Sequence, residues 1–198
     1  MATVLTKPAT LDDFLRAEAE APEGMRLALI DGEIVEWGAT MTTRGPSHSR
    51  VMSKLSFLLW SWVRRHSPPL GVVDCGEVRC RLNRDPSEVV GIDVAFWRGA
   101  EFSTPPTNPP LYDAPPTLAV EILSPSDTHE CVVDKVRLYL SRGVERVWLV
   151  DAELQTVTVC QQNCPPVSFN VKQTIKDDPA LPSLELQVRE LFDSCPSA

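Results

Sequence analysis

Residues 117–123 read TLAVEIL, a nearly continuous apolar run that predicts a β-strand buried on both faces. Residues 127–142 follow with the apolar spacing of an amphipathic helix, and Gly143 supplies the end of that helix. Residues 144–151, VERVWLVD, predict the next strand, and residues 89–97, VVGIDVAFW, predict another strand upstream. This alternation of strands with a helix is typical of an α/β domain.

The N-terminal half predicts a helix, a hairpin and a second helix. Thr10 is placed to cap the first helix, which we expect to end near Pro22. Asp31 and Gly32 separate two short apolar runs, and this pair is a strong signal for a two-residue hairpin turn. A second helix begins at Pro46, with apolar residues repeating along one face.

The remaining segments predict further strands around one long loop. Residues 71–83 predict a strand with an irregularity at Gly76, and residues 154–160 predict a partner for the preceding strand. Residues 98–116 contain six prolines, so we expect a long surface loop without regular structure. Residues 181–192 predict a short strand and a closing helix.

The length of 198 residues fits one domain with a sizeable core. We expect a loose N-terminal arm at residues 1–9 and a single domain over residues 10–198. No apolar stretch approaches the roughly 18 residues that cross a bilayer, and the N-terminus lacks an apolar secretory segment, so we expect a cytoplasmic protein without a membrane partner. The six cysteines form no Cys-x-x-Cys pair, so no structural zinc is expected.

The net charge of −8 argues against a large basic surface for nucleic acid, but it does not exclude a local basic patch. Arg64, Arg65 and His66 cluster at the end of the second helix. The cluster is either ordinary solvated surface or part of such a patch, and the sequence leaves both interpretations open.

Two acidic residues interrupt otherwise apolar strands. Asp93 lies within residues 89–97, and Glu121 lies within residues 117–123. Because a buried carboxylate without a partner costs several kcal/mol or more, each must meet a cation, hydrogen-bond donors or water. Two such carboxylates can share a divalent metal, and oxygen ligands suit Mg²⁺ or Mn²⁺. The alternative is a pair of structural carboxylates that cap turns or pair with arginine.

A lysine on the following helix belongs to the same hypothesis. Helical spacing places Lys135 on the edge of the apolar stripe, on a helix that can fold back over the end of the Glu121 strand. From there its amine can reach the carboxylate pair, where it would hold a water or a phosphate oxygen. The alternative is a lysine whose stem covers apolar surface.

Six segments of the chain resemble, in order, the Uma-two type putative restriction endonuclease family. They read ALIDGEIVEW, PSHSRVMSKLSFLL, IDVAFW, TLAVEILSPSD, DKVRLYLSRGVERVWLVD and LPSLELQVRELF, and the resemblance covers roughly residues 10–193. This family belongs to the PD-(D/E)XK nuclease superfamily. The resemblance implies a restriction-endonuclease-like fold, in which helices flank a mixed central β-sheet.

The resemblance also implies a DNA-cleaving site that uses Mg²⁺ or Mn²⁺. Asp93 and Glu121 would bind the metal, helped by the backbone carbonyl of Ile122. The superfamily lysine usually lies two residues after the second carboxylate, where this chain has Leu123, and Lys135 matches the displaced lysine of the Uma-two type. A homodimer is expected from the resemblance and because cleavage of both DNA strands needs two sites.

Three positions depart from the family pattern, and one matches it. Ile92 stands where the family usually has proline, Ala28 where it usually has glutamate, and Cys131 where it often has aspartate. The missing glutamate at Ala28 weakens a two-metal mechanism more than a one-metal mechanism. His48 matches a family histidine, and it either contacts a phosphate of the nucleic acid or bonds to backbone at the helix start.

Three functions remain open on the sequence. The first is a metal-dependent DNA endonuclease, with Asp93, Glu121 and Lys135 as its catalytic residues. The second is a catalytically weakened nuclease fold that acts as a DNA-binding or regulatory module, which the negative net charge and Ala28 favour. The third is a structural homodimer without nucleic acid.

Overall fold

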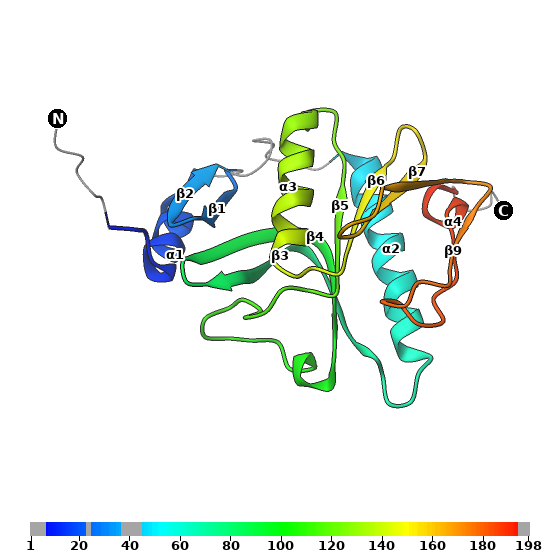
Figure 1. The fold of residues 1–198 in the computed structure, drawn as a ribbon, viewed down its shortest axis with the longest axis horizontal. Coiled ribbons are helices and arrows are strands. Elements are labelled where there is room, and N and C mark those ends of the chain that lie inside the picture. The colour runs from blue at the N-terminus through cyan, green and yellow to red at the C-terminus, as the bar shows by residue number, and fades with distance from the viewer. Residues whose placement is uncertain (1–6, 23–24, 37–44, 194–198) are drawn as a thin grey trace.

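A central β-sheet with a helix on each face organises residues 7–22, 25–36 and 45–193, which are the residues that the computed structural model describes (Figure 1). In spatial order the sheet contains β2 (Glu33–Glu36), β1 (Leu27–Ile30), β4 (Ser87–Arg98), β5 (Leu118–Ile122), β6 (Arg146–Asp151), β7 (Thr156–Cys160) and β8 (Val167–Asn170), with β3 (Gly71–Arg84) beside β4. Strands β5 and β6 are parallel and the other pairs are antiparallel, so the expected mixed α/β sheet is confirmed.

The long strand β4 positions the rest of the sheet. Strand β3 follows one edge of β4 over most of its length, with a register shift at Gly76 as the sequence predicted. On the opposite edge, β1 pairs near the start of β4 at Val89, and β5 pairs with its end from Val94 onward. Asp93 therefore lies between two stretches of β4 that have different partners.

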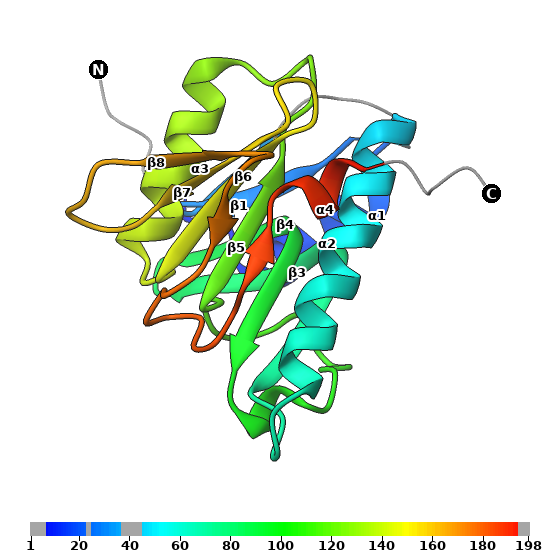
Figure 2. The ribbon, with the colours of Figure 1, turned by 90° about the vertical axis from the view of Figure 1, so that its right-hand side faces the viewer.

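The two long helices cover opposite faces of the sheet (Figure 2). Helix α2 (Pro46–Arg64) packs through its apolar face onto a core that includes Val94, Val120 and Trp148. Helix α3 (His129–Ser141) packs through Tyr139 onto the other face, beside Ala119 and Val147. None of the helices in the described ranges has the length and apolarity needed to cross a membrane.

The N-terminal elements form as the sequence predicted. Thr10 caps α1 (Leu11–Glu20), and Asp31 and Gly32 join β1 to β2 with positive φ angles of 50° and 79°. A Cβ on Gly32 would lie 2.6 Å from Cβ of Pro8, so only glycine fits this turn. The amide of Ala9 also donates to Gly32, so the last residue of the expected arm is attached to the hairpin, while residues 1–6 lie outside the described residues.

The C-terminal segment closes the face that α2 occupies. It contains β9 (Thr174–Ile175), β10 (Leu186–Gln187) and the short helix α4 (Arg189–Phe192), and its apolar residues join the α2 core. The strand and closing helix were predicted, whereas β8 and β9 were not. Both are short, and β8 is largely exposed, so neither produces a recognisable apolar pattern.

The proline-rich segment 98–116 is more ordered than the sequence predicted. It contains a 3₁₀ turn, η1 (Ala100–Phe102), and its later part is buried against the sheet. Tyr112 stacks on Trp97 with ring centroids 4.1 Å apart and forms a backbone bridge with Cys80. The expectation of a surface loop was therefore wrong for this part, because the aromatic pair anchors it.

Candidate active site

Asp93 and Glu121 lie where strands β4 and β5 separate. The antiparallel ladder between these strands ends at Val94 and Val120, so the next residue on each strand is acidic. Beyond that point β5 continues beside β6, and the amide of Ile122 donates to Oδ2 of Asp93 at 2.9 Å. A side-chain contact thus replaces the backbone ladder, and the two carboxylates lie at the base of the opening.

Glu121 is held by two residues of α3. Nζ of Lys135 donates to Oε2 at 2.8 Å, and the hydroxyl of Tyr139 donates to Oε1 at 2.8 Å. Lys135 and Tyr139 are four residues apart, so they lie on the same face of the helix. The helix therefore brings the amine of Lys135 to the carboxylate of Glu121, a contact that the helical spacing in the sequence allowed.

Asp93 is contacted from the other helix. Nε2 of His48, in the first turn of α2, lies 3.2 Å from the same Oδ2 that accepts the Ile122 amide. His48 is only 6% exposed. The ring of His48 thus contacts the Asp93 carboxylate, and contact of His48 with nucleic acid remains a prediction.

The electrostatics of this cluster follow from its burial. Asp93, Glu121 and Lys135 are all buried. Burial raises the pKa of Glu121, and the charge of Asp93 acts in the same direction, while Lys135 and Tyr139 oppose the shift. Burial disfavours the charged form of Lys135, but Glu121 outweighs it, with help from Asp127 and Asp93, and the pKa of Lys135 is raised.

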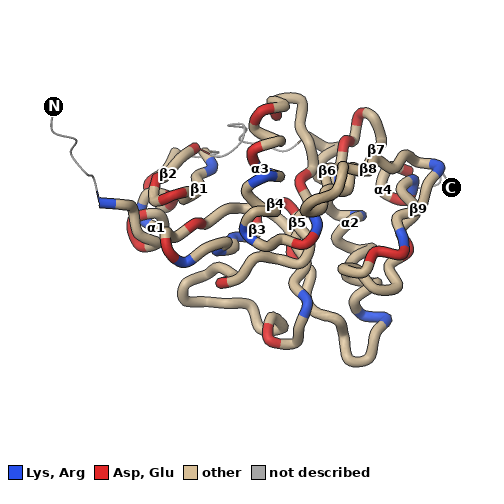
Figure 3. Tube along the Cα trace, in the orientation of Figure 1, with Lys and Arg blue, Asp and Glu red and all other residues tan. Residues whose placement is uncertain are grey.

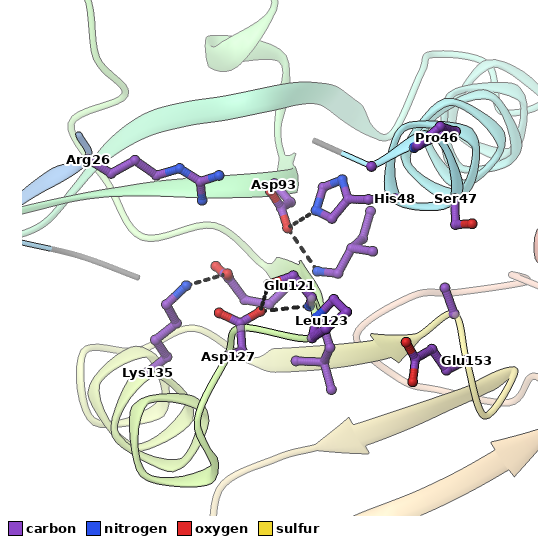
Figure 4. A pocket seen from close by; sticks show the side chains of 15 residues that line it. Arg26, Pro46, Ser47, His48, Asp93, Glu121, Leu123, Asp127, Lys135 and Glu153 are labelled. Carbon is purple, nitrogen blue, oxygen red and sulfur yellow. Dashed lines mark hydrogen bonds and ion pairs between the residues drawn. The ribbon is translucent and has the colours of Figure 1, made fainter. Parts of the chain in front are cut away.

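A pocket of about 320 Å³ opens above these side chains (Figure 4). Its wall includes Arg26, the α2 residues Pro46 and Ser47, and the acidic residues Asp127 and Glu153. Arg26 extends toward the cluster from the start of β1, and its guanidinium pairs with Glu77 at 2.8 Å. The pocket thus contains both acidic and basic groups, and is large enough for a small charged ligand.

Three of the residues around the carboxylates were not singled out from the sequence. Tyr139 was read only as part of the apolar stripe, although its spacing of four from Lys135 was a usable signal. Asp127 accepts from the amide of Ser124 at 2.7 Å, a local turn that the sequence SPSD also allows. Arg26 gave no signal, because the β3 irregularity that places Glu77 beside it is distant in sequence.

The departures from the family pattern occupy different environments. Ala28 is fully buried and belongs to the same apolar cluster as Tyr139 and Ile92. Cys131 is exposed in the first turn of α3, and the free cysteines described are Cys75, Cys80, Cys131, Cys160 and Cys164. Ala28 and Ile92 thus both pack in an apolar cluster, whereas Cys131 faces solvent.

Asp93 and Glu121 are the carboxylates that a divalent cation would meet at the base of the opening. Among the described residues no group of three or more His, Cys, Asp and Glu side chains is arranged to hold a metal. Mg²⁺, however, commonly binds one or two carboxylates and completes its shell with water and substrate phosphate. Asp93 and Glu121 provide two carboxylates whose mutual repulsion a cation would relieve, so the residues present fit Mg²⁺ or Mn²⁺.

A mixed sheet flanked by helices, with two acidic residues at separating strands, defines a restriction-endonuclease-like α/β protein. The chain matches the model of the Uma2 family, described as "Putative restriction endonuclease", over residues 11–189, and it therefore belongs to that family. No curated protein matches the chain.

A solved structure gives the same fold. It is a crystal structure described as a "putative nuclease belonging to DUF820" from Anabaena variabilis, with 23% sequence identity and a TM-score of 0.71. The alignment covers 93% of this chain and 98% of that chain. At this identity the similarity establishes the fold alone.

Proposed function

We propose that this chain is a metal-dependent DNA endonuclease that hydrolyses phosphodiester bonds with one Mg²⁺ or Mn²⁺. The observation that carries the proposal is the pair of buried carboxylates at separating strands, one of which is bonded to a lysine. Membership of the Uma2 family supports a nuclease activity. We infer from the acidic site and its basic neighbours that the substrate is DNA and that the cation is Mg²⁺ or Mn²⁺.

The proposed roles follow the observed contacts. Asp93 and Glu121, with the carbonyl of Ile122, would hold the cation, which would supply Lewis-acid activation of water and charge compensation for the phosphate. Lys135 orients the attacking water or stabilises charge that develops on the phosphate oxygens. Tyr139 fixes the orientation of Glu121 through its hydrogen bond.

Two features of the pocket wall suit a phosphate group. The N-terminus of α2 borders the pocket at Gly45, Pro46 and Ser47, and the positive end of a helix dipole favours an anion there. Arg26 borders the opposite side, and a guanidinium can bind two phosphate oxygens at once. The proposal therefore places the scissile phosphate between Arg26 and the start of α2.

A plasmid-nicking assay over a Mn²⁺ series tests the proposal. Asp93→Ala and Glu121→Ala should abolish both Mn²⁺ binding and cleavage, whereas Lys135→Ala should keep the metal and lose on the order of a hundredfold in rate. Ca²⁺ should support binding poorly or without turnover, because it accepts looser geometry and activates water less well than Mg²⁺. Asp134→Ala is the matched control, since this acid is 62% exposed on α3.

The outcome separates the candidate functions. Equal cleavage by the wild-type protein and Asp93→Ala would reveal a contaminating nuclease and contradict the assignment. Mn²⁺ binding without cleavage by the wild-type protein would favour the second candidate, a DNA-binding or regulatory module on a nuclease fold. The apolar surroundings of Ala28 and the net charge of −8 favour that candidate.

Homodimer formation and a cytoplasmic location remain predictions. Sedimentation at micromolar concentration checks the first, and a monomer under those conditions would contradict it. If the dimer forms, its two-fold symmetry would present one site to each DNA strand.

A further inference from the structure

The outward face of α2 carries large apolar side chains beside cations. Phe57 is 66% exposed and Trp60 is 50% exposed, and their spacing of three residues places them on one side of the helix. The guanidinium carbon of Arg64 lies 5.1 Å from the centroid of the Trp60 ring, in cation–π range. Arg50 is exposed two turns before Phe57 on the same side. We call Arg50, Phe57, Trp60 and Arg64 the α2 stripe.

Charge along this part of the chain is segregated by sign. Residues 37–73 contain no Asp or Glu, although the whole chain has a net charge of −8. The cations of α2 are Arg50, Lys54 and Arg64. A local excess of positive charge on an otherwise acidic protein favours a polyanionic partner. Arg65 is outside the stripe, because it borders a separate pocket beside Glu185 and Glu190.

The stripe is continuous with the candidate active site. Ser47 in the first turn of α2 is exposed and lines the pocket, and Arg50 lies three residues after Ser47, on the same side of the helix. From Arg50 to Arg64 the helix rises by about 21 Å, a length that about six stacked nucleotides would cover. Figure 3 shows the cations at the far end of the helix, and Figure 2 shows α2 along the side of the molecule.

The chemistry of the stripe indicates an unpaired strand rather than a duplex. Proteins that bind single-stranded nucleic acid combine cations that contact phosphates with aromatic side chains on which bases stack. A duplex hides the faces of its bases, so exposed Phe57 and Trp60 would have no stacking partner there. Arg50 and Arg64 are spaced to contact phosphates on either side of these two rings.

A second copy of the chain fits this face of α2 less well than a nucleic-acid strand does. A two-fold interface would place α2 against α2, because the same patch is used by both subunits. The cations of one stripe would then meet those of the other, and α2 contains no acid to compensate them. Like charges brought together in this way oppose association.

We propose that the α2 stripe binds an unpaired DNA strand and leads it to the pocket at the start of α2. The substrate would then be single-stranded or branched DNA. This proposal rests on the proposed nuclease function, and it names the class of DNA that reaches the site.

Fluorescence anisotropy with a labelled single-stranded oligonucleotide and its duplex tests the proposal. Binding is measured in EDTA over a salt series, with the wild-type protein and with Asp93→Ala, so that cleavage does not interfere. The double variant Phe57→Ala/Trp60→Ala should lose at least about tenfold in affinity for the single strand. The double variant Arg50→Ala/Arg64→Ala should lower the salt slope by about 1.4, for two phosphate contacts on a single strand.

Matched controls come from exposed residues elsewhere. Val167→Ala removes an apolar side chain that is 53% exposed on β8, and Arg137→Ala removes a cation that is 78% exposed on α3. Neither should change the affinity for DNA. Circular dichroism and a thermal melt verify that each stripe variant retains the fold.

Each outcome bears on one proposal. Unchanged single-strand affinity in both stripe variants overturns the stripe as a DNA surface, even if the wild-type protein cleaves DNA. If the duplex binds more tightly than the single strand, and only Arg50→Ala/Arg64→Ala loses DNA affinity, the proposal that the stripe binds an unpaired strand is overturned. If the wild-type protein is a dimer and Phe57→Ala/Trp60→Ala is a monomer with unchanged DNA affinity, the stripe is instead an interface between two copies of the chain, which overturns the proposal. Stripe-dependent binding without cleavage supports the stripe and overturns only the nuclease function.

Discussion

The hydroxyl of Tyr139 donates to Oε1 of Glu121 at 2.8 Å, while the other oxygen of that carboxylate accepts from Lys135. Tyr139 is fully buried, so this hydrogen bond is protected from water. One helix therefore fixes the orientation of Glu121. Lys135 balances the charge of the carboxylate through Oε2, and Tyr139 holds its geometry through Oε1. Tyr139, which is not among the residues that line the pocket, thus sets the orientation of a carboxylate of the proposed metal site.

Replacing Tyr139 with Phe should lower activity and Mn²⁺ affinity together. The variant keeps the ring but removes the donor to Oε1, and loss of such a supporting hydrogen bond typically costs about 10–100-fold in metal affinity or activity. Tyr112→Phe is the matched control, because its hydroxyl bonds to Asp74 outside the pocket. Mn²⁺ titration and cleavage rates check this. Equal losses in both variants would show a general effect on the fold.

Lys135→Ala should make stability depend on the metal. Removal of one member of a buried ion pair typically costs about 3–5 kcal/mol, because the remaining charge is uncompensated. Mn²⁺ bound near Glu121 would supply the missing charge, so the variant should recover more stability from Mn²⁺ than the wild-type protein does. Urea unfolding in EDTA and in Mn²⁺ measures this difference. The control Lys176→Ala removes an exposed amine and should respond like the wild-type protein.

A third buried carboxylate lies away from the pocket. Glu88 at the start of β4 is fully buried, and Arg142 at the end of α3 bonds to both of its oxygens. Arg142→Ala should therefore destabilise the protein by about 3 kcal/mol, toward the lower end for buried pairs because Arg142 is 31% exposed. Arg137→Ala, whose pair with Asp134 is exposed, should cost less than about 1 kcal/mol in the same urea titration.

The central elements were predictable because their signals are local. The buried strand around Glu121, the helix after it and the following strand each have a distinct apolar pattern, and the helical period also places Lys135. The predicted hairpin turn at Asp31 and Gly32 depends on two adjacent residues. Features of this kind need no knowledge of distant segments.

The rest of the site depends on contacts between distant segments. His48 and Asp93 are 45 residues apart in sequence, and they meet at the point where β4 changes partners. Arg26 is held by Glu77, which the β3 irregularity places with a positive φ of 59°. Neither contact produces a periodic signal in the sequence, so the family resemblance was needed for His48 and only the structure revealed Arg26.

The buried position of Ala28 offers a test of the one-metal interpretation. Ala28→Glu introduces the carboxylate that the family usually has, into a cluster that also contains Tyr139. Without metal the variant should lose at least about 2 kcal/mol, because a buried carboxylate lacks a partner there. Mn²⁺ should restore part of that loss and bind more tightly than in the wild-type protein, since the added oxygens would complete the site.

Ala28→Leu is the matched control, because it adds similar volume without charge and should not respond to Mn²⁺. Calorimetric titration and thermal melts in EDTA and in Mn²⁺ provide the comparison. If the glutamate variant responds to Mn²⁺ no more than the leucine variant, position 28 does not reach the metal, and the absence of glutamate there has no bearing on the number of metal ions.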